Sequence, residues 1–196
     1  MIQHERRERI LRSAIRAFGR LGYKGVSVDE IAREAGVAKG TVYLAARNKE
    51  DLYYQAVLYE VRQFLAECSR NFDPRMPADQ LLEKCTRDGI EVLRQRPLVR
   101  QLLAWHMDEL PEWRARFMEL RDMTKSAIAE ILRVGVRQGV FRADLDVDET
   151  AALLRDMQAG GYIFYVVRGE DEGREDVYLH RTIAGLRLVL DGLRSR

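Results

Sequence analysis

The sequence features that most constrain the fold of this chain are the start and stop signals of two short helices near the N-terminus. Ser27 is followed three residues later by Glu30, which is the spacing of a capping box at a helix start. Gly36 interrupts the apolar helical pattern about two turns further on, and Asn48 offers another N-cap. Two short helices joined by a glycine-containing turn form a helix-turn-helix. The second helix of such a unit can lie in the major groove of DNA.

Helical spacing of apolar residues continues along the chain, and no alternating strand pattern is present. Gly22 follows the first apolar stripe and is a natural helix stop. With only 4 prolines, the sequence predicts an all-α fold of nine helices. The predicted helices cover residues 8–21, 27–35, 38–46, 49–69, 78–95, 98–109, 111–138, 147–167 and 174–193.

Charge is distributed unevenly along the chain. Residues 1–49 carry 11 Lys and Arg against 5 Asp and Glu, whereas residues 50–196 carry 22 against 26. A basic N-terminal segment on an acidic body is expected where one end of a protein contacts a polyanion. An ordinary solvated charged surface has the same composition, so charge alone does not choose between these interpretations.

Membrane, secreted and metal-binding classes find no support in the sequence. The longest uncharged run, residues 157–167, has 11 residues, whereas a membrane-spanning helix needs roughly 20. The first residues contain no apolar signal core. Cys68 and Cys85 are the only cysteines and lie in no metal-ligand spacing. We expect a cytoplasmic protein without a membrane segment, a metal site or a cofactor.

Many N-terminal residues together form a familiar pattern. They are Arg9-Ile10-Leu11, Ala17-Phe18, Gly22-Tyr23, Ser27-Val28-Asp29-Glu30-Ile31-Ala32, Ala35-Gly36-Val37-Ala38-Lys39-Gly40-Thr41-Val42-Tyr43 and Asn48-Lys49-Glu50-Asp51-Leu52. This pattern, over roughly the first 55 residues, resembles the DNA-binding domain of the tetracycline-repressor (TetR) family of bacterial regulators. The number of positions that match at fixed spacing makes the resemblance specific.

The resemblance implies a set of DNA-contacting residues. Residues near helix starts would approach the phosphate backbone, and residues early in the recognition helix would face the groove. These residues are Ser27, Val28, Lys39, Gly40, Thr41, Tyr43 and Lys49. Lys39 and Thr41 are the candidates for base reading, because Lys can address guanine and Thr a base edge or a thymine methyl group. Taken singly, Ser27 could simply cap a helix and the two lysines could be ordinary surface residues.

Two positions depart from the family pattern. Ala38 stands where the family usually has Ser or Thr, so the third helix lacks a side-chain cap. Ala46 stands where the family usually has an aromatic residue that packs the recognition helix onto the core. We expect Tyr53 or Tyr54 to refill part of that space.

For the rest of the chain, the resemblance implies a small-molecule sensor. It divides the chain into a helix-turn-helix DNA-binding domain, residues 1–52, and a helical effector-binding and dimerisation domain, residues 53–196. Aromatic and sulfur-containing side chains could line an effector pocket of mixed polarity, although at helical spacing such residues also build ordinary cores. The candidates are Trp105, His106, Phe117, Met123, Met157, Tyr162 and Tyr165.

The resemblance implies that the last two helices form the dimer interface, as a four-helix bundle with the same helices of a second copy, and a palindromic DNA site requires such a two-fold protein. Gly160 and Gly161 lie within an apolar helix, which indicates a close helix approach, either across the dimer or beside a ligand; the alternative is a local kink. The main hypothesis is therefore a homodimeric, ligand-responsive transcriptional repressor that binds an inverted-repeat operator and is released by a small-molecule effector. Alternatives are control by a protein partner or by thiol oxidation at Cys68 or Cys85, and an enzyme, for which the sequence offers no catalytic motif.

Overall fold

The computed structural model describes residues 2–70, 73, 75–104, 113–163 and 175–194. Within these residues it contains nine helices and no strand, which confirms the all-α prediction. None of the helices in these ranges combines the length and apolar character that crossing a membrane requires. The chain divides into two compact units, called here unit 1 (Met1–Gln63 with Arg96–Leu102) and unit 2 (Phe64–Gln95 with Leu103–Arg196).

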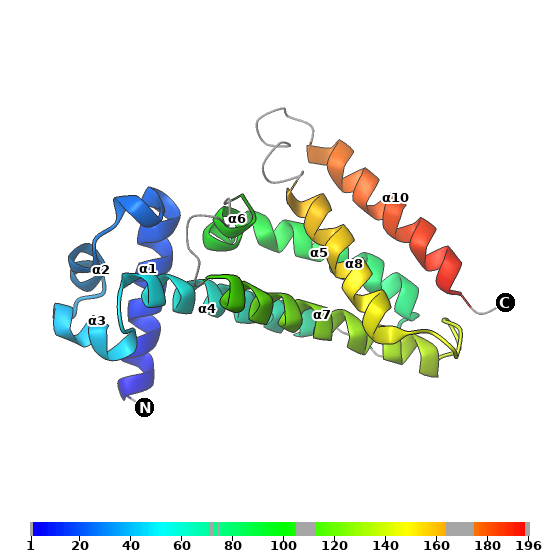
Figure 1. Ribbon diagram of the computed structural model, residues 1–196, viewed down its shortest axis with the longest axis horizontal. Coiled ribbons are helices and arrows are strands. Elements are labelled where there is room, and N and C mark those ends of the chain that lie inside the picture. Colours follow the sequence, from blue (N-terminus) through cyan, green and yellow to red (C-terminus); the bar gives the residue numbers. More distant parts are fainter. Residues whose placement is uncertain (1, 71–72, 74, 105–112, 164–174, 195–196) are drawn as a thin grey trace. The chain divides into compact units, whose positions relative to one another are not determined.

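Unit 1 is built from three N-terminal helices and parts of two others. They are α1 (Ile2–Gly25), α2 (Val28–Glu34), α3 (Lys39–Ala45), the first part of α4 (Lys49–Arg70) and most of α6 (Pro97–Ala104). Helices α2 and α3 pack against each other and against α1 (Figure 1). The helix-turn-helix expected from the sequence is therefore present and is supported by α1.

Helix α1 is longer at both ends than the predicted helix over residues 8–21. It begins at Ile2, because the charged residues before position 8 favour helix without adding to the apolar stripe that guided the prediction. Gly22 does leave helical geometry, with φ 71° and ψ 169°, so it kinks the chain as a glycine can. One further turn to Gly25 follows the kink.

An aromatic cluster fills the centre of unit 1. The Tyr53 ring lies edge-on to Phe18 with ring centroids 5.0 Å apart, and edge-on to Tyr23 at 5.4 Å. Tyr53 and Phe18 are almost completely buried, and Tyr54 and Ala46 are buried as well. Offset and edge-to-face pairs of this kind stabilise a core beyond the area that they bury. The α4 tyrosines thus supply aromatic packing to a unit whose recognition helix ends on a small residue.

Helix α6 adds a segment from far along the chain to unit 1. Pro97 packs so closely on Gly19 of α1 that any side chain at Gly19 would collide with it. The Gln101 amide donates hydrogen bonds of 3.1 Å to the backbone oxygens of Phe18 and Gly19. Leu98 is completely buried. These contacts join α6 to α1 across about 80 residues of sequence.

A buried carboxylate joins α6 to α4. Glu60 is 2% exposed, and its Oε2 accepts hydrogen bonds from the backbone N–H groups of Leu98 at 3.1 Å and Val99 at 3.2 Å. The side chain therefore satisfies two of the amide groups that every helix start leaves without an internal partner. Burial outweighs these hydrogen bonds and raises the pKa of Glu60 to about 7.

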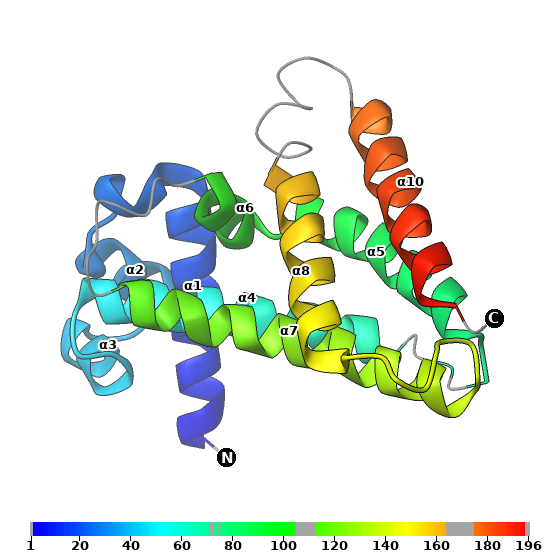
Figure 2. The ribbon, with the colours of Figure 1, turned by 45° about the vertical axis from the view of Figure 1, so that its right-hand side comes forward.

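Unit 2 is a helical bundle formed by α5 (Ala78–Arg94), α7 (Trp113–Arg137), α8 (Val147–Ile163) and α10 (Glu175–Leu193). Helix α8 packs against α7 and α10, and α5 packs against the same two helices (Figure 2). The core joins buried leucines and isoleucines of all four helices to the connection after α7. Leu145, in that connection, is 8% exposed and belongs to the core.

Glycines permit the closest approaches in unit 2. A side chain at Gly135 of α7 would overlap the ring of Phe141, so glycine is needed for this ring to pack. Gly161 of α8 faces Thr182 of α10 at a distance that excludes a side chain, whereas the position beside Gly160 is open. The close approach at Gly161 is thus made to a helix of the same chain, whereas the sequence led us to expect an approach across a dimer or beside a ligand.

Candidate nucleic-acid interface

The start of α2 is fixed by the predicted capping box. The Ser27 hydroxyl accepts a hydrogen bond from the Glu30 backbone N–H at 3.2 Å, and Glu30 Oε2 accepts one from the Ser27 N–H at 2.7 Å. The Ser27 hydroxyl also donates to the same carboxylate at 2.8 Å. These bonds lower the pKa of the Glu30 carboxyl. Val28 is 8% exposed, so its side chain packs inward and only its backbone can approach a phosphate.

A tight turn connects α2 to α3. Gly36 has φ 64°, a conformation that favours glycine, and the Val37 N–H donates to the Ala32 oxygen at 3.0 Å. Ala38 follows with extended backbone geometry at the N-cap of α3 and makes no side-chain hydrogen bond to the helix. The missing cap expected from the sequence is therefore confirmed, and Ala38 does not supply the first amides of α3 with the side-chain acceptor that an N-cap residue usually provides.

Helix α3 has one buried and one exposed face. Val42, 1% exposed, and Ala46, 5% exposed, hold it against the rest of unit 1. Lys39, Gly40 and Tyr43 lie on the exposed side, and Tyr43 is 45% exposed. Thr41 is half-buried, so less of it is accessible than of its neighbours. The most exposed side chain of this face is that of Leu44, at 85%, a residue for which the sequence pattern predicted no role.

Lys39 is engaged within the protein. Its Nζ forms an ion pair of 2.8 Å with Asp29 Oδ2 at the start of α2, and this pairing raises the pKa of Lys39. Both side chains are more than half exposed, at 51% for Lys39 and 65% for Asp29. Exposed ion pairs contribute little to stability, so a phosphate or a guanine edge can replace Asp29 as the partner.

The start of α4 carries the second cap that the sequence predicts. The Asn48 side-chain oxygen accepts a hydrogen bond from the Asp51 N–H at 2.7 Å, and Asp51 Oδ2 accepts one from the Arg47 N–H at 2.9 Å. Lys49, expected at a phosphate, lies with its Nζ 4.7 Å from the centre of the Tyr23 ring. This cation–π contact places the ammonium group at the first turn of α4.

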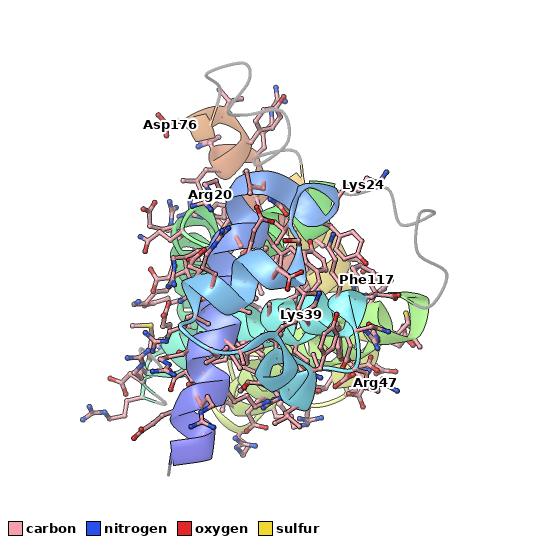
Figure 3. The ribbon with its side chains drawn as sticks, turned by 90° about the vertical axis from the view of Figure 1, so that its left-hand side faces the viewer. Arg20, Lys24, Lys39, Arg47, Phe117 and Asp176 are labelled. Atoms are coloured by element: carbon pink, nitrogen blue, oxygen red, sulfur yellow. The ribbon has the colours of Figure 1, made fainter. Side chains whose placement is uncertain are left out.

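Basic side chains surround the helix-turn-helix. Figure 3 looks onto this side of unit 1 and labels Arg20 and Lys24 in the last turns of α1, Lys39 at the start of α3 and Arg47 in the connection between α3 and α4. Arg47 has 81% of its side chain exposed and lies 3.7 Å from Asp51. A positive surface of this kind attracts the phosphate backbone independently of sequence.

The predicted effector residues fall in different surroundings. Met123 lines a groove of about 660 Å³ in unit 2, whose walls are Leu65, Ala115, Met118, Glu119, Asp122, Met123 and Ser126. Met157 packs against the main core of unit 2, and Tyr162 packs with Ile90, Tyr178 and Leu179. Phe117 is half-buried on α7. Trp105, His106 and Tyr165 lie outside the described residues.

The two cysteines are poor candidates for a redox switch. Both are free thiols and both are half-buried. Burial raises the pKa of Cys68 to about 11 and also raises the pKa of Cys85. Since the thiolate is the reactive form, these thiols react slowly at neutral pH. Within the described residues, no three His, Cys, Asp or Glu side chains are grouped so that they could hold a metal ion.

The uncapped start of α3 allows a first prediction. Ala38→Ser is expected to stabilise unit 1 by about 1 kcal/mol, because the backbone at position 38 already has N-cap geometry and serine adds the missing acceptor. Chemical denaturation followed by circular dichroism measures the change. Ala45→Ser, inside the same helix, is the matched control and should not stabilise. Equal effects of the two substitutions would contradict this explanation.

These features define a DNA-binding protein: the second helix of the helix-turn-helix is packed firmly on unit 1, its other face is exposed, and basic side chains surround the motif. Comparison with known proteins identifies the family within this class. Residues 10–56 match the family model for bacterial regulatory proteins of the tetR family. The chain belongs to the TetR family of transcriptional regulators, whose members are non-enzymatic proteins that bind DNA, dimerise and bind small-molecule effectors.

Relatives match over most of their length. The transcriptional repressor KstR2 of Mycolicibacterium smegmatis is 30% identical over 159 residues, which cover 77% of this chain and 75% of KstR2. The regulator UidR of Escherichia coli K12 is 25% identical over 187 residues, covering 95% and 92%. The structure of Bacillus subtilis FadR in complex with stearoyl-CoA superposes with a TM-score of 0.73 at 22% identity, covering 95% of this chain and 99% of FadR.

Proposed function

We propose that this regulator is a homodimeric repressor that binds an inverted-repeat operator through α3 of each subunit and leaves it when a small-molecule effector binds. The observation that carries the proposal is that α3 has one buried face and one exposed face. Val42 and Ala46 fix the helix to unit 1, while Lys39, Gly40 and Tyr43 remain exposed on the opposite side. The proposed division of functions is DNA binding by residues 1–52 and effector binding and dimerisation by residues 53–196. Action on the bacterial chromosome implies a cytoplasmic location.

The proposed dimer interface lies on α8 and α10. Leu153 of α8 is 58% exposed and Leu188 of α10 is 76% exposed, although both helices pack within unit 2. Large apolar side chains that remain exposed on neighbouring helices suit a second copy of the same surface. A two-fold dimer presents two recognition helices, and an inverted repeat is the DNA that matches that symmetry.

The proposed effector site includes the groove beside Met123 in unit 2. Most of its lining is apolar, and Glu119 and Asp122 add two carboxylates. This composition favours an apolar effector that carries a hydrogen-bond donor or a positive charge over a strongly anionic one. FadR of B. subtilis was solved with stearoyl-CoA, whose phosphates would face repulsion from these two carboxylates.

Effector control requires a ligand that binds two conformations of the protein unequally. Helices α4 and α6 each contribute residues to both units. A change in unit 2 that shifts either helix therefore reaches residues of unit 1 through continuous backbone. We propose that α4 is the principal connection, because its first turn carries Lys49 and the Asn48 cap.

The test begins with selection of the purified protein on random duplex DNA. We expect enrichment of an inverted repeat. Lys39→Ala should then weaken binding to that repeat by about tenfold, and Tyr43→Phe severalfold, because each removes a contact from α3. Quantitative binding assays at fixed salt concentration measure both effects.

Arg142→Ala is the matched control for Lys39→Ala, since its side chain is 52% exposed and lies in unit 2. It should leave affinity for the repeat unchanged. Failure to enrich any sequence, with a folded dimer in hand, would refute the proposed function. Normal affinity of the Lys39 and Tyr43 variants would instead refute the assignment of the site.

A further inference from the structure

Leu44 is an unusual residue for the surface that it occupies. It is 85% exposed, the largest exposed fraction among the large hydrophobic side chains of the described residues. Its neighbours on the same face of α3 are Lys39, Gly40 and Tyr43, all exposed. Single exposed leucines are common on proteins, but this one lies on the face proposed to enter the major groove.

Helix geometry directs Leu44 toward Gly40. Residues four apart lie one above the other on a helix, and each side chain leans toward the N-terminus. Leu44 therefore extends over the turn that contains Gly40. A side chain added at Gly40 would meet no atom within 4 Å, so the space beside Leu44 is open. A binding partner with an apolar edge can thus contact the Leu44 side chain while lying close to the backbone at Gly40.

We propose that Leu44 is a specificity-determining residue that contacts the 5-methyl group of one thymine in each operator half-site; this inference rests on the proposed function. The thymine methyl is the apolar group that the major groove presents, so it is the part of a base edge that an aliphatic side chain recognises. A cytosine at the same position lacks this methyl group and carries an amino donor where thymine has O4; because Leu44 offers no acceptor for that donor, cytosine would be disfavoured.

The decisive experiment removes the methyl group alone. Each thymine of the selected operator is replaced in turn by deoxyuridine, symmetrically in both half-sites, and binding is measured for the wild type and for Leu44→Ala. We expect one position at which the wild type loses roughly fourfold in affinity per half-site, as for one buried methyl group. At that position Leu44→Ala should show no loss, because it no longer contacts the methyl.

Leu44→Met is the matched control, since it keeps an apolar side chain of similar length and should keep the sensitivity to deoxyuridine. Any change in DNA shape caused by uracil acts on the wild type and on Leu44→Ala alike, so only the difference between them reports the contact. Because Leu44 is so exposed, its replacement leaves the core of unit 1 intact.

The outcomes separate the two proposals. An operator that is selected normally but shows no methyl-sensitive thymine, or the same sensitivity with Leu44→Ala, overturns the role of Leu44 and leaves the proposed function standing. Failure to select any operator overturns both. A methyl-sensitive thymine that becomes insensitive with Leu44→Ala supports the contact.

Discussion

Replacing Leu153 and Leu188 together by glutamate is expected to convert the dimer into monomers. The two side chains are 58% and 76% exposed on α8 and α10, and in the proposed dimer they are buried against the partner. The substitutions remove apolar contacts and place unpaired charges in the interface, so the dimer dissociation constant should rise by roughly a hundredfold or more. Sedimentation velocity over a range of concentrations measures this change.

Loss of the dimer should also abolish tight operator binding. A monomer contacts one half-site only and loses the effective concentration that links two half-sites, so operator affinity should fall by about a hundredfold or more. Met118→Glu on α7 is the control for dimerisation alone, because Met118 is also an exposed apolar residue, at 47%, but lies off these two helices, in the wall of the proposed effector groove. A Leu153 and Leu188 double variant that remains dimeric would place the interface elsewhere.

Glu60 is expected to make the stability of unit 1 decrease as pH rises. Its pKa is raised from an ordinary 4.5 to about 7, so folding favours the protonated form. That contribution is fully present below pH 4.5 and is lost as pH rises through 7. Between pH 5 and pH 8 the loss should be on the order of 2–3 kcal/mol in the free energy of unfolding. Chemical denaturation at each pH measures it.

Glu60→Gln should remove this pH dependence, because the amide stays neutral and still offers an oxygen to the N–H groups of Leu98 and Val99. Hydrogen exchange at those two amides locates the effect in α6. Glu130→Gln on α7, with 57% of its side chain exposed, is the control and should keep the wild-type profile. Arg187 and Arg87 lower the pKa of Glu83 to about 2, so this carboxylate contributes stability that is lost as pH falls. That loss occurs below about pH 5 and does not affect the measured range. A profile unchanged by Glu60→Gln would contradict the prediction.

Local signals in the sequence predicted local structure well. The spacing of Ser27 and Glu30 predicted the capping box, and Asn48 predicted the cap of α4, because each motif bonds residues within one helical turn. The missing cap at Ala38 was also predicted. The first helix was predicted too short, since its early turns carry charge rather than an apolar stripe.

Contacts between distant residues left no such signal. Glu60 and Leu98 are 38 positions apart, and no periodicity relates an acidic residue on one helix to the amides of another. The ion pair of Lys39 with Asp29, and the position of Lys49 over Tyr23, depend on how helices pack. Leu44 was missed for a different reason. No role was predicted for it, because the position of an aliphatic residue in the sequence does not reveal how much of its side chain is exposed.

The contribution of α6 to unit 1 has a consequence for recombination between regulators. A fragment cut after residue 63 would lack Pro97, Leu98 and Gln101, and would leave the Glu60 carboxylate and the Phe18 and Gly19 carbonyls without their partners. Exchange of N-terminal modules between relatives, by evolution or by engineering, therefore has to keep residues 96–102 matched to the incoming module. The compact unit that contains the helix-turn-helix is thus encoded by two separate stretches of the gene.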